Sequence, residues 1–128
     1  MIFRTIAVFF ATASPGLACT DISPDVIPLR SELDNAPAAY AEMGSPPVSA
    51  PFTLKVVVCD RQVSDLAFDA LMPAHQHGMN FDAEVAKSGA TEFTVSNVVF
   101  HMPGLWELQI EAVTDHNSHN YTAKVELE

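Results

Sequence analysis

A two-residue alternation of apolar and polar side chains constrains this chain more than any other feature. Its clearest example is the segment 106–112, whose apolar members are Trp106, Leu108, Ile110 and Ala112. Successive side chains of a β-strand point to opposite faces, so this period predicts a strand with one buried face. Similar segments lie at 52–59, 66–72, 81–86, 92–101 and 121–127. Because no segment has sustained helical periodicity, we predict an all-β fold, an immunoglobulin-like antiparallel β-sandwich.

One of these segments breaks its own alternation. Residues 92–101 are apolar at every second position until Ser96 and Asn97 interrupt the pattern. An extra residue in one strand of a pair shifts the pattern in this way, so we predict a β-bulge or a change of sheet there.

Residues 1–18 have the order of a secretory signal. A single cation, Arg4, precedes an apolar run over residues 6–13, and Gly16 and Ala18 place small side chains where a signal peptidase cuts. The run is far shorter than the roughly 20 residues of a membrane span. We therefore expect a cleaved signal peptide and a periplasmic or secreted protein. The alternative is a buried N-terminal helix or strand.

The chain has two cysteines, Cys19 and Cys59. In an exported chain we favour a disulfide between them. The closed loop from residue 19 to residue 59 would stabilise the fold by roughly 4 kcal/mol in the chain-entropy model. The alternative is a lipoprotein acylated at Cys19, although Gly16 stands where such signals normally have an aliphatic residue.

Charge and proline content characterise the chain beyond residue 18. Removing residues 1–18 leaves 5 basic against 16 acidic side chains, a net charge near −11, which argues against nucleic-acid and anionic-membrane partners. Six prolines between residues 20 and 51 exclude a long helix. They predict an extended arm over residues 19–51, with a short strand near residues 26–29 as an option, and a sandwich domain over residues 52–128.

Two short segments, residues 72–79 and 101–104, contain three of the five histidines and three of the four methionines beyond residue 18. Counting strand directions places both segments at one end of the sandwich, and Cys59, His116 and His119 at the other. The candidate metal ligands are His75, His77, Met79, His101 and Met102. Met72 fits the end of the core better than a metal site.

The donor types favour copper. Thioether selects Cu(I) and imidazole serves either oxidation state, whereas zinc sites usually contain thiolate or carboxylate. Neither occurs within the two segments, although Asp82 is close in sequence. The alternative is structural: methionines before prolines fill strand ends, and His101 hydrogen-bonds the backbone and holds two loops together.

The same segments carry a resemblance to a family. Residues 72–79, Met-Pro-Ala-His-Gln-His-Gly-Met, and 99–108, Val-Phe-His-Met-Pro-Gly-Leu-Trp-Glu-Leu, resemble the YtkA-like domain, which is related to FixH-like proteins. The resemblance covers about residues 51–126. It implies an exported immunoglobulin-like sandwich with links to copper handling and respiratory oxidase assembly. The pairs His77-Gly-Met79 and His101-Met102 are also similar to the motifs by which periplasmic copper chaperones bind Cu(I).

These observations leave two functional hypotheses. The first is a periplasmic copper chaperone or buffer that uses the five candidate ligands. The second is a metal-free interaction module that docks on a membrane complex or transporter subunit, with the histidine loop as a structural clasp. No nucleophile motif or phosphate loop occurs in the sequence, so we do not expect an enzyme.

Overall fold

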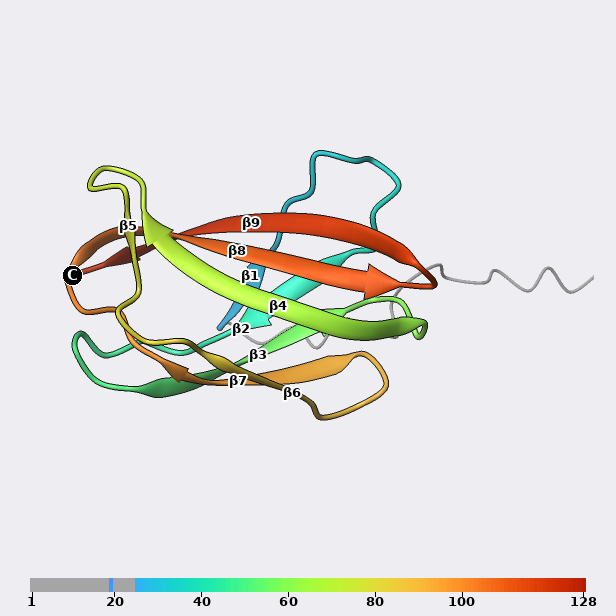
Figure 1. Cartoon of the computed structure of the whole chain (residues 1–128), viewed down its shortest axis with the longest axis horizontal. Coiled ribbons are helices and arrows are strands. Elements are labelled where there is room, and N and C mark those ends of the chain that lie inside the picture. Colours follow the sequence, from blue (N-terminus) through green and yellow to red (C-terminus); the bar gives the residue numbers. More distant parts are fainter. Residues whose placement is uncertain (1–18, 20–24) are drawn as a thin grey trace, which may run out of the picture.

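The computed structural model describes residue 19 and residues 25–128. The strands in this part of the chain form two packed antiparallel sheets (Figure 1). The first sheet has the strand order β1-β2-β3-β7-β6 and the second β5-β4-β8-β9. The strands of this part of the chain are β1 Val26–Pro28, β2 Ala39–Glu42, β3 Phe52–Val58, β4 Val63–Met72, β5 His77–Gly78, β6 Glu84–Lys87, β7 Glu92–Val98, β8 Gly104–Thr114 and β9 Asn117–Leu127. The predicted antiparallel β-sandwich is confirmed. The predicted signal peptide, residues 1–18, lies outside the described residues.

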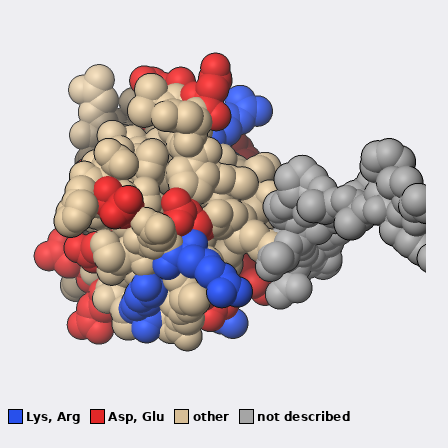
Figure 2. All heavy atoms as spheres, turned by 90° about the vertical axis from the view of Figure 1, so that its right-hand side faces the viewer, with Lys and Arg blue, Asp and Glu red and all other residues tan. Residues whose placement is uncertain are grey.

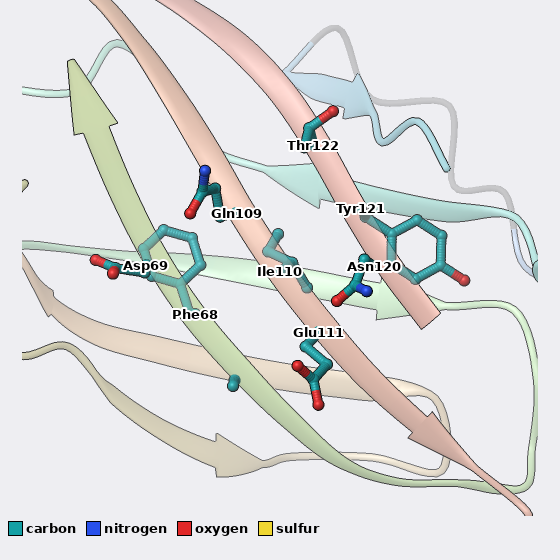
Figure 3. A pocket seen from close by; sticks show the side chains of 9 residues that line it. Phe68, Asp69, Gln109, Ile110, Glu111, Asn120, Tyr121 and Thr122 are labelled. Carbon is teal, nitrogen blue, oxygen red and sulfur yellow. The ribbon is translucent and has the colours of Figure 1, made fainter. Parts of the chain in front are cut away.

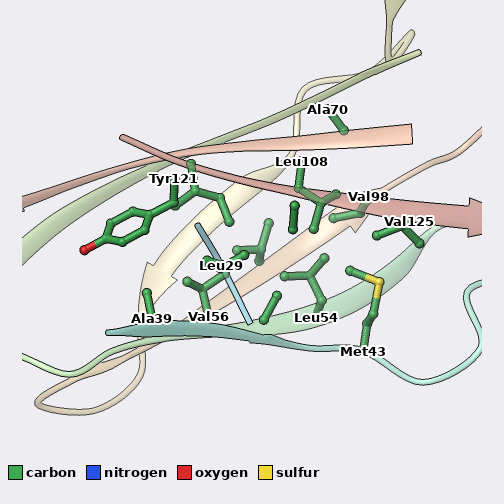
Figure 4. Close-up of a cluster of buried hydrophobic side chains, with 14 of the residues drawn as sticks. Leu29, Ala39, Met43, Leu54, Val56, Ala70, Val98, Leu108, Tyr121 and Val125 are labelled. Carbon is green, nitrogen blue, oxygen red and sulfur yellow. The ribbon is translucent and has the colours of Figure 1, made fainter. Parts of the chain in front are cut away.

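The core follows the period-two pattern of the sequence. Trp106, Leu108 and Ala112 of β8 are fully buried, and Tyr121 of the neighbouring β9 is 2% exposed. Figure 4 shows side chains of both layers meeting between the sheets, including Leu54 and Val56 from β3. Burial of one face of each strand is the main stabilising contribution of such a sandwich.

The bulge predicted in the 92–101 segment is confirmed. Phe52 of β3 pairs with Val98 and Leu54 pairs with Val95, so β7 contains one more residue than β3 between these pairs. Asn97 occupies the left-handed region at a φ of 57°, which asparagine tolerates better than most residues. Beyond the bulge, residues 98–100 are all buried, and the chain leaves the sheet just before His101.

Two strands of the first sheet come from the proline-rich segment. The short strand near residues 26–29 is confirmed as β1, whereas the expectation of an otherwise irregular arm is wrong at β2. β2 pairs with β3 from Ala39 opposite Val58 to Glu42 opposite Lys55. Alanine has a low intrinsic β-propensity, so the strand is fixed by its backbone pairing and by the burial of Ala39 and Ala41. The sandwich therefore begins before residue 52.

The disulfide is formed between Cys19 and Cys59, whose Cα atoms are 5.5 Å apart. It confirms the predicted pairing, and its sulfur atoms leave no thiol at Cys19 for a lipid thioether. A disulfide of this kind is consistent with an oxidising compartment outside the cytoplasm. Within the described part of the chain, no helix has the length and apolar character needed to cross a membrane.

Candidate functional site

The two histidine-containing segments lie at the same end of the sandwich, as their strand directions predict. β4 ends at Met72, and a tight hairpin leads from it into β5. The connection from β7 to β8 passes through His101. Figure 1 shows both connections at the end of the molecule where the C-terminus is marked.

The hairpin exposes its two histidines. The backbone N–H groups of His75 and Gln76 both donate to the carbonyl oxygen of Met72, at 3.2 and 2.8 Å. Gln76 has a φ of 52°, and His77 then pairs with Met72 across the hairpin. A side chain at Gly78 would place its Cβ 3.3 Å from the Ala70 carbonyl oxygen, so the close return of β5 favours glycine there. This geometry leaves His75 and His77 exposed to solvent.

Three imidazole rings form a row across the two segments. The ring centroids of His75 and His77 are 5.6 Å apart and nearly parallel, with 25° between their planes. The ring of His77 in turn lies 5.1 Å from that of His101, at an angle of 32°. The structure therefore brings together three of the five candidate ligands.

The backbone around His101 is held from both sides. Ser49 donates from its backbone N–H to the Phe100 carbonyl oxygen at 2.8 Å and from its hydroxyl to the His101 carbonyl oxygen at 3.1 Å. The indole N–H of Trp106 donates to the Met102 carbonyl oxygen at 2.9 Å. Three successive carbonyl groups are thus satisfied, which fixes the position of His101. No sequence pattern pointed to Ser49, because it lies in the proline-rich segment.

One nitrogen of His101 has no hydrogen-bond partner among the residues that the structure describes. The His101 ring is half-buried and packs edge to face with the fully buried Trp106 ring, with 5.3 Å between the centroids. The nitrogen without a partner is the buried Nδ1 atom. Most buried polar atoms have a partner, and an unsatisfied one costs on the order of 1–3 kcal/mol. A bound ion is one of the ways in which such an atom is satisfied.

The methionines divide into two kinds. Met72 is 2% exposed and belongs to the core, as expected. Its Cε would be 2.9 Å from a Cβ at Gly104, a residue whose φ of 126° also favours glycine. Met79 and Met102 are half-buried and pack against the rim of the core. Each of them belongs to one of the two histidine segments.

The histidine row is not a preformed three-ligand cage. Among the described residues, no group of three or more His, Cys, Asp or Glu side chains is arranged to hold a metal ion. Asp82 therefore does not complete a carboxylate site with the histidines. The donors that remain are imidazole pairs and thioethers, which suit a two- or three-coordinate soft ion better than a tetrahedral zinc.

The opposite end of the sandwich holds the other two histidines, as predicted. Val63 at the start of β4 pairs with Thr114 at the end of β8, and the tight turn after it contains the exposed His116. A nitrogen of His119, Nε2, lies 2.9 Å from the Thr114 hydroxyl oxygen. Figure 2, which faces this end, shows basic side chains beside acidic ones.

Two hollows of the surface are not lined by imidazole rings. A cavity of about 410 Å³ on the second sheet is lined by Asp69, Gln109, Glu111, Asn120 and Thr122, among others (Figure 3). A second hollow of about 520 Å³ includes Gly78 and Met79 and runs along the side of the sandwich. Neither is lined by a histidine.

Comparison with known proteins adds no relative. No protein-family model, curated protein or solved structure matches the chain. The similarity of residues 72–79 and 99–108 to the YtkA-like domain therefore stays a prediction.

Proposed function

We propose that this chain is an exported copper-binding protein, a chaperone or buffer. Its metal site would be built on His77 and His101, with His75, Met79 and Met102 as further donors. The observation that carries the proposal is the row of three imidazole rings from two distant segments, which ends on the half-buried ring of His101. One nitrogen of that ring has no hydrogen-bond partner among the described residues.

The donor chemistry supports Cu(I) as the bound ion. Imidazole and thioether are both ligands of Cu(I), and a low coordination number suits an ion that is to be handed on. His101 is held by the backbone contacts of Ser49 and Trp106, so it would act as the fixed ligand. His75 and His77 lie on an exposed hairpin, from which a partner could take the ion.

The disulfide supports a place outside the cytoplasm, and the signal-like N-terminus fits a periplasmic or secreted protein. A link to respiratory oxidase assembly rests on the resemblance to the YtkA-like domain alone.

A metal-free interaction module that docks on a membrane complex or transporter subunit is the second candidate. The observation that favours it is the tilted contact between the rings of His77 and His101, together with the edge-to-face packing of His101 and Trp106. Rings packed in this way would clasp the β4–β5 hairpin to the β7–β8 connection. The two candidates differ in whether the row has measurable affinity for copper.

A Cu(I) titration against a chromophoric chelator, under anaerobic conditions, separates them. Wild type is compared with His77→Ala and His101→Ala, and His116→Ala serves as the control because His116 is an exposed histidine at the other end. We expect one tight Cu(I) per chain, weakened by both site variants and unchanged in the control. No binding that competes with the chelator, or equal weakening by the control, would leave the clasp as the function of the row.

A further inference from the structure

The second hollow of the surface runs between the free edges of the two sheets. β6 is the last strand of the first sheet, and β5 pairs only with the final two residues of β4. Within the described residues, the part of β4 before them has no strand partner on that side, and β4 and β6 contact each other there. We call the resulting hollow of about 520 Å³ the flank groove. Its lining residues are Ala67, Phe68, Asp69, Gly78, Met79, Phe81, Asp82, Ala83 and Val85.

The flank groove has an apolar floor beside an exposed aromatic ring. Phe68, Met79, Ala83 and Val85 are partly buried and pack against the core. Phe81 is 59% exposed, which makes it one of three large exposed apolar side chains in the described chain, with Leu33 and Leu105. Exposed apolar surface that gathers around one hollow is typical of a binding site.

Acidic side chains predominate on this flank of the sandwich. Asp65, Asp69, Asp82 and Glu84 all lie on its strands or loop and are exposed. Within the described chain the one ion pair is Lys55 with Glu92, so none of these four carboxylates is paired with a cation. Lys87 donates a hydrogen bond to the Val63 carbonyl oxygen, at the end of the flank opposite to the imidazole row. A partner that brings positive charge is therefore favoured here.

The backbone of β4 is protected against pairing with a further strand. The carboxylates of Asp65 and Asp69 accept hydrogen bonds from the N–H groups of Leu66 and Ala70, each at 2.8 Å. Charged side chains that cover an edge in this way discourage the addition of a strand. A partner would be recognised through side chains that enter the flank groove.

We propose that the flank groove docks a segment of a partner protein in which an apolar side chain is flanked by lysine or arginine. The apolar side chain would pack between Phe68, Phe81 and Val85, and the cations would face the carboxylates of Asp69 and Asp82. A second copy of this chain fits less well, because its own acidic rim would face the first. The docked segment would lie next to His77, since Gly78 and Met79 line the groove, but the proposal does not require bound metal.

The test is a metal-free NMR titration of the ¹⁵N-labelled chain with a short peptide of alternating lysine and leucine, and with the same peptide carrying glutamate for lysine. We expect the lysine peptide to shift backbone signals of residues 67–69 and 78–85 with one-site saturation, and the glutamate peptide to have no effect. Phe81→Ser should weaken binding about tenfold, because the bound segment would bury the part of the Phe81 ring that is exposed in the free chain. Leu33→Ser, which removes an equally exposed side chain elsewhere, should change nothing.

Two results would overturn the proposal. One is a set of shifts spread over the acidic surface with the same affinity in Phe81→Ser and Leu33→Ser, which would indicate unspecific attraction between opposite charges. The other is concentration-dependent self-association of the free chain that Phe81→Ser abolishes, which would assign the groove to a second copy. Neither result bears on copper binding, because none of the proposed metal ligands is changed.

Discussion

Each end of the sandwich contains a histidine whose buried Nδ1 atom has no hydrogen-bond partner in the described part of the chain, His101 at one end and His119 at the other. The other ring nitrogen of His119, Nε2, forms a hydrogen bond with the Thr114 hydroxyl group. The preceding histidine, His116, is exposed to solvent in a turn. The ring of His101 is followed by two further imidazoles in a row. An unsatisfied nitrogen alone therefore does not define a site, and what distinguishes His101 from His119 is the row of two further imidazoles beside it.

The two ends also differ in how they are stabilised. At the His119 end, a disulfide, the Thr114 contact and the hydrogen bond from the Tyr121 hydroxyl to the Pro37 carbonyl oxygen hold the strands and the N-terminal segment together. At the His101 end, backbone contacts fix one connection while the hairpin with His75 and His77 remains exposed. We infer that the first end serves stability and the second function.

The largest expected effect on stability is the loss of the disulfide. Cys59→Ser should lower the free energy of unfolding by about 4 kcal/mol, because the bond closes a long loop in the unfolded chain. Urea denaturation measures this loss, and Cys19→Ser should match it since it removes the same bond. The Cu(I) affinity should not change in the variant that carries both Cys19→Ser and Cys59→Ser, because this variant has no free thiol that could itself bind Cu(I). A large drop in affinity would contradict the separation of the two ends.

A smaller loss is expected at Thr114. Thr114→Val keeps the shape of a side chain that is 3% exposed but removes the partner of His119 Nε2. The free energy of unfolding should fall by about 1–2 kcal/mol, because Nε2 of His119 loses the hydrogen bond that it forms with Thr114. Ser118→Ala, an exposed position on the same hairpin, is the control. An unchanged stability of Thr114→Val would show that the contact is not part of the support at this end.

Near neutral pH, the smallest loss of stability is expected when Tyr121 is replaced, and this replacement should also change how stability depends on pH. Burial, and then the charge of Asp60, raise the pKa of Tyr121 above its ordinary value of 10.0. Its protonated form therefore supports the fold fully below about pH 10, and this support is lost as the pH rises through the folded-state pKa. Tyr121→Phe should cost about 1 kcal/mol at pH 7 and make stability less sensitive to pH above 10. If wild type and Tyr121→Phe had the same pH dependence of stability above pH 10, the role of the Tyr121 hydroxyl group would be contradicted.

Much of the fold was predictable because burial imposes a period of two on β8, β9 and the strands they face. The bulge at Asn97 was predictable for the same reason, since one extra residue reverses the pattern. Strand direction alone placed His77 and His101 at the same end. β2 was not predictable, because Ala39 and Ala41 become a strand only through pairing with β3. The contacts of Ser49 with residues 100 and 101 were not predictable either. Ser49 makes them with a φ of 65°, and no local sequence pattern indicates this backbone conformation.

The most direct test of the copper site compares the two ends of one molecule. Cu(I) is diamagnetic, so long-range ¹H–¹⁵N NMR spectra of the five histidine rings can be recorded before and after one equivalent is added anaerobically. We predict that the ring nitrogen signals of His77 and His101 shift most, those of His75 shift less, and those of His116 and His119 stay in place. Shifts confined to His116 and His119, or equal small shifts at all five rings, would contradict the assignment of the imidazole row as a copper site.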